Sequence, residues 1–221
     1  MKLSNDTLRI LKNFAEINGN LTITKGNMLE TVHVPPTIYA KATISEVFET
    51  NFGIYDLKEF IATLSMFKDP TLEFGEDFVT IIDDDDPTIK TKYWRTNDVN
   101  LTKIPKFKQF PDPIAKFELS EVNLKRIEKA SVTLKCPDVV LEGKDGKIIA
   151  RVCDLKNGTK NDFTIVLTND YSGEEFNVHL LQEKLMIIDA DYQCEMIANK
   201  LIRLTNQDNT LMYIITLDVN R

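Results

Sequence analysis

Apolar residues recur at the spacing of an amphipathic helix near the start of the chain. Leu8, Leu11 and Ala15 lie three or four residues apart, so one face of a helix would carry all of them. Ser4 precedes this pattern as a favourable N-cap, and Asn18 with the glycine after it ends the pattern. We therefore predict a first helix between Ser4 and Asn18.

Two further stretches show the same helical spacing. Asp56 and Glu59 form the D-x-x-E arrangement that caps the start of a helix. The apolar positions of this second helix are Leu57, Phe60, Ile61, Leu64 and Phe67. Ser120 opens a third helix, because a helical pattern follows it directly. The apolar positions of the third helix are Val122, Ile127, Ala130, Ser131 and Leu134. A fourth helical stretch, over residues 181–184, is short and weak.

Short runs bounded by Gly, Pro and Asn predict strands between the helices. In the first half they are Leu21–Lys25, Met28–Val34, Ile38–Ile44, Asn51–Tyr55, Leu72–Phe74, Phe78–Ile82 and Thr88–Trp94. In the second half they are Ile114–Glu118, Asp138–Glu142, Lys147–Val152, Phe163–Thr168, Phe176–Leu180, Leu185–Ile188, Tyr192–Ile197, Lys200–Thr205 and Leu211–Val219. Alternation within these runs indicates antiparallel sheets packed on one face.

The predicted elements repeat a unit of strand, helix and three strands about four times, twice in each half. Three of the eight prolines stand between residues 97 and 113. Because proline blocks both helix and central strand, we interpret this segment as an extended connector. The sequence therefore predicts an α+β protein with two pseudo-symmetric domains. The first comprises residues 1–110 and includes the connector, and the second comprises residues 111–221.

Charge is distributed unevenly along this acidic chain of 221 residues, which has a net charge of −7. Residues 2–18 hold three cations against two anions, and residues 119–135 hold four against two, whereas residues 56–68 are neutral. A protein that gripped nucleic acid with its whole surface would be basic. Any such contact must therefore come from the local basic faces of the first and third helices. Lys and Arg on an exposed helix face are, however, more often merely solvated.

The cysteines and the hydropathy of the chain indicate in which cellular compartment the protein is expected. The chain has three cysteines, Cys136, Cys153 and Cys194, and no C-x-x-C pair. An odd number argues against a disulfide framework and favours a reducing cytoplasm. The first residues lack the apolar core of a signal peptide, and no apolar stretch reaches membrane-spanning length. We expect a cytoplasmic protein without a membrane partner.

No motif in the sequence favours catalysis or a bound cofactor. Gly-rich phosphate loops and the G-x-S-x-G turn are absent. His33 and His179 have no companion at ligand spacing. The acidic run Asp83–Asp86 lacks the Gly and Glu of a calcium loop, so a solvated turn is expected there. We therefore expect no catalytic residue, no metal site and no cofactor, and a protein that is not an enzyme.

Three segments are distinctive: MKLSNDTLRILKNFAEIN at the N-terminus, IYDLKEFIATLSMF around the second helix, and the hairpin GKDGKIIARV in the second half. They resemble the sliding clamp, or DNA polymerase processivity factor, of T-even-type tailed phages. The match runs in the same order over nearly the whole chain. It implies the DNA clamp fold and a homotrimeric ring, in which sheets form the outside, helices line a bore, and edge strands pair between neighbours.

The resemblance also implies partners. They are duplex DNA bound without sequence preference, a DNA polymerase, a clamp loader ATPase complex and phage late-transcription factors, all in the host cytoplasm. It places on the bore the residues Lys2, Asn5, Arg9, Lys12, Lys58, Lys125, Arg126 and Lys129. Because phosphate contacts carry no sequence information, such a surface would let the ring slide.

The apolar tails of partner proteins are expected near the connector, where the candidates are Trp94, Ile104, Phe107 and Phe110. For Trp94 and the neighbouring Tyr93, ordinary core packing is the competing interpretation. Two other classes of protein stay open. A structural or adaptor phage protein with duplicated α+β domains would show neither a trimer nor a role for DNA. An enzyme is least favoured, because no His, Cys or carboxylate motif converges.

Overall fold

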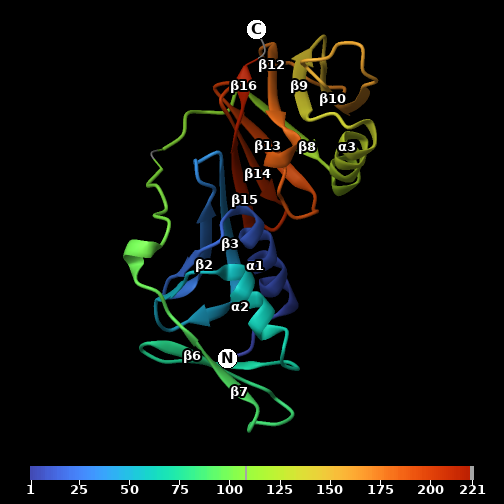
Figure 1. The fold of residues 1–221 in the computed structure, drawn as a ribbon. Coiled ribbons are helices and arrows are strands. Elements are labelled where there is room, and N and C mark those ends of the chain that lie inside the picture. The colour runs from blue at the N-terminus through green and yellow to red at the C-terminus, as the bar shows by residue number, and fades with distance from the viewer. Residues whose placement is uncertain (108, 220–221) are drawn as a thin grey trace. The chain divides into compact units, whose positions relative to one another are not determined.

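The computed structural model describes residues 1–107 and 109–219. The chain divides into two compact units, Met1–Pro105 and Lys106–Arg221. Each described unit combines α-helix with antiparallel sheet (Figure 1), so the predicted α+β class is confirmed. None of the described helices has the length and apolar character needed to cross a membrane.

The first unit contains two helices and seven strands within the described residues. They are α1 (Asn5–Ile17), β1 (Leu21–Ile23), β2 (Gly26–Val32), β3 (Ile38–Phe48), β4 (Phe52–Ile54), α2 (Leu57–Leu64), β5 (Thr71–Phe74), β6 (Phe78–Ile82) and β7 (Lys90–Trp94), followed by the 3-10 turn η1 (Asp98–Asn100). The strand pairs β1–β4, β2–β3, β5–β6 and β6–β7 are all antiparallel. In Figure 1, α1 and α2 lie side by side, and they also contact each other.

The second unit contains one α-helix and nine strands within the described residues. They are β8 (Ala115–Leu119), α3 (Glu121–Leu134), β9 (Asp138–Lys144), β10 (Lys147–Cys153), β11 (Phe163–Thr168), β12 (Phe176–Leu181), the 3-10 turn η2 (Gln182–Lys184), β13 (Tyr192–Ile197), β14 (Leu201–Asn206), β15 (Leu211–Thr216) and β16 (Asp218–Val219). One sheet has the order β11-β10-β9-β12-β16, and β8, β13, β14 and β15 pair successively in another. The helix α3 packs against β10 and β11.

The buried faces follow the predicted periodicity closely in the first unit. Helix α1 buries Leu11, Phe14 and Ala15, and α2 buries Leu57 and Phe60. These apolar stripes remove the helices' hydrophobic side chains from water and leave the opposite faces exposed, which is where any contact with a polar partner must occur.

The third helix differs in detail from the prediction. Val122 is 58% exposed, whereas Leu124, which the pattern did not assign to the core, is fully buried with Ile127 and Ser131. Leu124 lies three residues before Ile127 and seven before Ser131, so it shares their face of the helix, whereas Val122 lies on another face. The predicted positions Ile127 and Ser131 are thus buried as expected, and Leu124 takes the place of Val122 on the buried face of α3.

The short fourth helical stretch is a single 3-10 turn: η2 covers Gln182–Lys184, and Leu181 still belongs to β12. The strand predicted directly after it was wrong. The run Leu185–Ile188 is not a strand: Leu185, Ile187 and Ile188 are buried in an irregular segment. A short apolar run signals burial, and its periodicity alone does not distinguish a strand from other buried backbone.

Candidate nucleic-acid interface

The first basic face belongs to α1, whose start is held on β3. The Ser4 hydroxyl accepts a hydrogen bond from the Thr7 amide at 3.2 Å. Glu46 of β3 accepts hydrogen bonds from the Ser4 amide and, at 2.5 Å, from the Thr7 hydroxyl. Burial alone would raise the pKa of Glu46, but these hydrogen bonds outweigh it and lower that pKa. The first turn of α1 is therefore capped by its own residue and by the sheet.

Asn5, Arg9, Lys12 and Glu16 recur every three or four residues and form an exposed stripe along α1. Within the described part of the chain, neither Arg9 nor Lys12 has an acidic partner. Glu16 forms an ion pair with Lys58 of α2, with 3.0 Å between Lys58 Nζ and Glu16 Oε1. The charge of Lys58 is therefore balanced locally, whereas Arg9 and Lys12 face solvent as uncompensated cations.

The charge of Lys2, which lies just before α1, is also balanced by neighbouring carboxylates. Its Nζ forms ion pairs with Asp69 and, at 2.8 Å, with Asp84. Hydrogen bonds to these two carboxylates raise the pKa of Lys2. The two acids lie 15 residues apart in sequence, so Lys2 joins the turn before β5 to the turn between β6 and β7.

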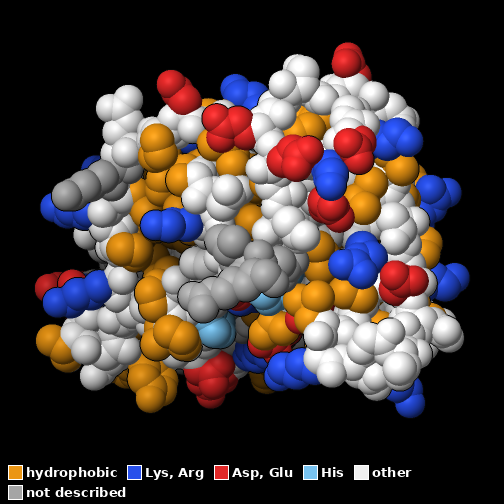
Figure 2. All heavy atoms as spheres, turned by 90° about the horizontal axis from the view of Figure 1, so that it is seen from above, with side chains coloured by type: hydrophobic (Ala, Val, Ile, Leu, Met, Phe, Trp, Pro, Cys, Tyr) orange, Lys and Arg blue, Asp and Glu red, His pale blue; other side chains and the backbone are white. Residues whose placement is uncertain are grey.

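The second basic face belongs to α3. Lys125 forms an ion pair with Glu121, one helical turn away, and lies 3.6 Å from Asp189. Arg126 donates a hydrogen bond to the side-chain oxygen of Asn123 at 3.5 Å. Lys129 is exposed and has no acidic partner among the described residues. Elsewhere both signs of charge are interspersed, as on the face shown in Figure 2.

Tyr93 and Trp94 at the end of β7 have different environments. The Tyr93 ring packs edge-on against Phe60, with 5.1 Å between ring centroids. Trp94 is 64% exposed and contacts Phe78 edge-on at 5.2 Å on the other face of the sheet. Core packing thus accounts for Tyr93, and Trp94 is left as an exposed aromatic surface beside Phe78.

The other candidate partner-binding residues lie in the connector. Ile104 and Phe110 are half-buried, and Phe107 is 43% exposed. The rings of Phe107 and Phe110 lie 5.8 Å apart. Upstream of them, Leu101 is buried against Gly53, where an added Cβ would come within 2.7 Å of the leucine side chain. The start of the connector is therefore fastened to the first unit.

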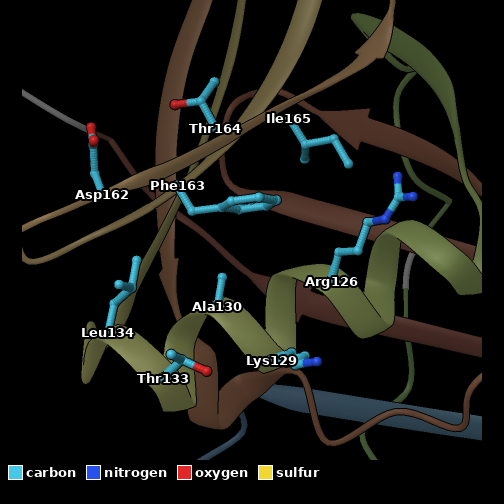
Figure 3. A pocket seen from close by; sticks show the side chains of 9 residues that line it. All are labelled: Arg126, Lys129, Ala130, Thr133, Leu134, Asp162, Phe163, Thr164 and Ile165. Atoms are coloured by element: carbon cyan, nitrogen blue, oxygen red, sulfur yellow. The ribbon is translucent and has the colours of Figure 1, made fainter.

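An open hollow of about 590 Å³ lies between α3 and β11 (Figure 3). Its lining residues are Arg126, Lys129, Ala130, Thr133, Leu134, Asp162, Phe163, Thr164 and Ile165. In Figure 3 Asp162 and Arg126 lie on opposite sides of the hollow, with the apolar side chains of Phe163 and Ile165 between them. Because β11 is an outer strand of its sheet, the hollow borders backbone groups that no described strand pairs on that side. Sequence periodicity did not reveal it, since residues 126–134 and 162–165 are distant in sequence.

The structure offers no group of three His, Cys, Asp or Glu side chains placed to hold a metal ion among the residues it describes. The Asp83 carboxylate accepts hydrogen bonds from the amides of Lys68, Asp85 and Asp86, so the acidic run forms an exposed turn. Cys153 and Cys194 are buried, and burial raises the pKa of both thiols. Buried thiols of raised pKa react poorly as nucleophiles.

The two units, with helices on antiparallel sheets, define the class of protein. The chain superposes on the proliferating cell nuclear antigen of A. fulgidus, solved with the C-terminal region of FEN-1 bound, with a TM-score of 0.71 over 97% of this chain and 94% of that one. Sequence identity there is 11%, so the likeness shows the fold. The predicted DNA clamp fold is confirmed.

Sequence similarity identifies the family within this class. The profile of the DNA polymerase processivity factors matches residues 4–74. The chain is 31% identical to the sliding clamp of Vibrio phage KVP40 over 198 residues, which cover 87% of this chain and 89% of the relative. It is 30% identical to the sliding clamp of Enterobacteria phage T4 over 200 residues, which cover 87% and 86%. The chain belongs to the family of phage sliding clamps, the DNA polymerase processivity factors.

Proposed function

We propose that three copies of this chain close into a ring around duplex DNA and hold a replicative DNA polymerase on it. The two units serve as the two clamp domains of each copy, and the ring performs no chemistry of its own. Membership of the phage sliding clamps supports this proposal over a structural or adaptor role. The single observation that carries the DNA contact is the set of helix cations Arg9, Lys12, Arg126 and Lys129, which have no acidic partner among the described residues of this acidic chain.

In this proposal the exposed faces of the helices surround the duplex. The residues assigned to the DNA side are Lys2, Asn5, Arg9, Lys12, Lys58, Lys125, Arg126 and Lys129. Contacts from such residues to phosphates are independent of sequence and weaken with salt, because binding releases counterions. A shallow attraction of this kind centres the DNA without pinning the ring to one site, and the acidic remainder of the chain disfavours contact elsewhere.

We assign the contacts between copies to two outer strands. In the first unit β7 is an outer strand of the β5-β6-β7 sheet. The opposite edge, at β5, is covered, because the backbone N–H and C=O groups of Leu72 form hydrogen bonds of 2.7 Å with Met1. In the second unit β11 ends its sheet. Pairing of β7 in one copy with β11 in the next would satisfy both edges and close the ring head to tail.

The exposed aromatic of β7 fits this arrangement. If the two strands pair antiparallel, as do all described pairs within each unit, the end of β7 at Trp94 lies beside the start of β11 at Phe163. Phe163 lines the hollow next to α3. Trp94 of one copy would then bury its exposed ring in the hollow of its neighbour, which removes apolar surface from water on both sides.

Other partners are proposed from the same family relationship. We assign the apolar tails of the polymerase to the surface near the connector, where Ile104, Phe107 and Phe110 would contact them. The exposed ring of Trp94 is a further candidate contact for these tails, as an alternative to its role between copies. A clamp loader ATPase would open the ring and supply the ATP chemistry, and phage late-transcription factors would use the loaded clamp in the host cytoplasm.

Primer extension on a primed circular template tests the function directly. With the cognate polymerase and loader, adding the clamp should lengthen the products made in one binding event, measured with a competitor DNA trap. Omitting the loader should abolish the gain on a closed circle. Products of unchanged length with all components present would refute the proposed function.

A further inference from the structure

The cations of the three helices fall into two groups. Lys58 is paired with Glu16 at 3.0 Å, and Lys125 is paired with Glu121 and lies 3.6 Å from Asp189. Arg9, Lys12, Arg126 and Lys129 have no acidic partner in the part of the chain that the structure describes, and Arg126 bonds only to the neutral side chain of Asn123. A count of basic residues does not show this distinction, because the cations of both groups are exposed residues of the helices.

Glu16 stands within the basic stripe of α1, not behind it. It follows Arg9 by seven residues and Lys12 by four, and both separations return to the same helix face. The side chains of Glu16 and Lys58 are 59% and 61% exposed, so the pair lies at the surface that the proposed function gives to DNA. On α3, Glu121 precedes Lys125 by four residues and likewise shares its face.

Fold stability does not explain these pairs. Exposed ion pairs contribute little to folding free energy, because water and salt screen them. These pairs have a larger effect on the attraction of a polyanion such as DNA. A carboxylate a few ångströms from a lysine cancels most of the lysine's electric field at distances beyond the screening length, which is about 8 Å at physiological salt. Hydrogen bonding to Glu121 also raises the pKa of Lys125, in keeping with a stable ion pair.

We propose that Glu16, Glu121 and Asp189 limit the grip of the ring on DNA by occupying Lys58 and Lys125. The hold on phosphates is then set by Arg9, Lys12, Arg126 and Lys129, which have no acidic partner among the described residues, and the paired lysines are withheld from it. Each phosphate that a cation neutralises steepens the salt dependence of binding by about 0.9 in the logarithmic slope, and three copies multiply this effect. Withholding two lysines in each copy therefore keeps the ring mobile. This inference rests on the proposed function.

The test uses the full-length clamp loaded by its loader on end-blocked linear duplex. Glu16→Gln removes the carboxylate charge and keeps the shape, so Lys58 becomes available to phosphate. We expect slower one-dimensional diffusion of the ring and a logarithmic salt slope of retention steeper by about 0.9 for each additional phosphate that a released lysine neutralises. The combined change of Glu121→Gln and Asp189→Asn should do the same through Lys125.

Two matched variants make the result specific. Glu49→Gln changes the net charge equally at an exposed residue outside the helices and should diffuse like the parent. Glu16→Gln combined with Lys58→Gln should return to the parent's diffusion and salt slope, because the released lysine is absent. The inference is overturned if Glu16→Gln matches Glu49→Gln, or if the steeper slope survives removal of Lys58. A parent clamp that is not retained on loaded DNA would overturn the proposed function instead.

Discussion

Tyr93 on β7 donates a hydrogen bond from its hydroxyl to the backbone carbonyl of Asp56, the N-cap of α2, at 2.9 Å. Burial raises the pKa of this hydroxyl to about 12, so the donor proton is retained at neutral pH. The bond fastens an outer strand, which we assign to the contact between copies, to a helix that we assign to the DNA side. Strand and helix therefore hold a fixed position within the first unit.

Replacing Tyr93 by Phe removes the hydroxyl and keeps the ring packed on Phe60. We expect the clamp to lose about 1 kcal/mol of unfolding free energy, the usual net contribution of one hydrogen bond. Urea unfolding followed by circular dichroism measures this change. Unaltered stability would show that water replaces the hydroxyl without cost. Ring assembly should persist, since Trp94 keeps its exposed position.

Trp94 is the chain's only tryptophan, and its exposed ring is available as a reporter. If it enters the hollow of a neighbouring copy, its emission should shift to shorter wavelength as concentration rises from monomer to trimer. Light scattering on the same samples gives the mass. An emission spectrum that stays unchanged while the mass triples would exclude Trp94 from the contact.

Truncating this side chain should weaken the ring without unfolding the subunit. For Trp94→Ala we expect a rise of about 30-fold in the dissociation constant of a contact between copies, which corresponds to about 2 kcal/mol for a central aromatic residue. Sedimentation velocity over a dilution series measures it. Val99→Ala, at a residue 86% exposed outside β7, is the matched control and should assemble like the parent.

Glu46 makes the attachment of α1 dependent on pH. The pKa of Glu46 is lower in the folded chain than in the unfolded chain. Its contribution to the free energy of unfolding is therefore fully present above the unfolded pKa of about 4.3 and is lost as the pH falls through the folded pKa. Glu46→Gln should therefore cost about 1 kcal/mol at pH 7 and less below pH 4. Urea midpoints at both pH values measure the difference. An equal loss of unfolding free energy at both pH values would show that the effect of the substitution comes from the shape of the side chain and not from its charge.

Charge reversal tests the DNA side as a whole. Changing Arg9, Lys12, Lys125, Arg126 and Lys129 together to Glu should reduce retention on loaded DNA strongly at 50 mM salt and less at high salt, because screening weakens the repulsion. Thermal unfolding should change little, since exposed charges contribute little stability. Retention equal to the parent at low salt would move the DNA contact to another surface.

Local sequence determined much of the fold. The caps at Ser4, Asp56 and Ser120 mark the starts of three helices, because side-chain oxygens next to free amides act within a few residues. The alternation of Ile148, Ala150 and Val152 set the inner face of β10, where all three are buried. The segment Leu185–Ile188 escaped this reasoning, because its burial comes from the surrounding tertiary structure.

The sequence by itself determined where the basic residues on and beside the three helices lie and, through its resemblance to phage clamps, what kind of protein carries them. Only the tertiary structure decided which of these cations are free. Lys58 meets Glu16 across two helices, 42 residues apart, and Lys2 meets Asp69 and Asp84. It likewise turned Tyr93 inward and left Trp94 exposed. Such pairings depend on how distant segments pack, and helical spacing contains no information about that.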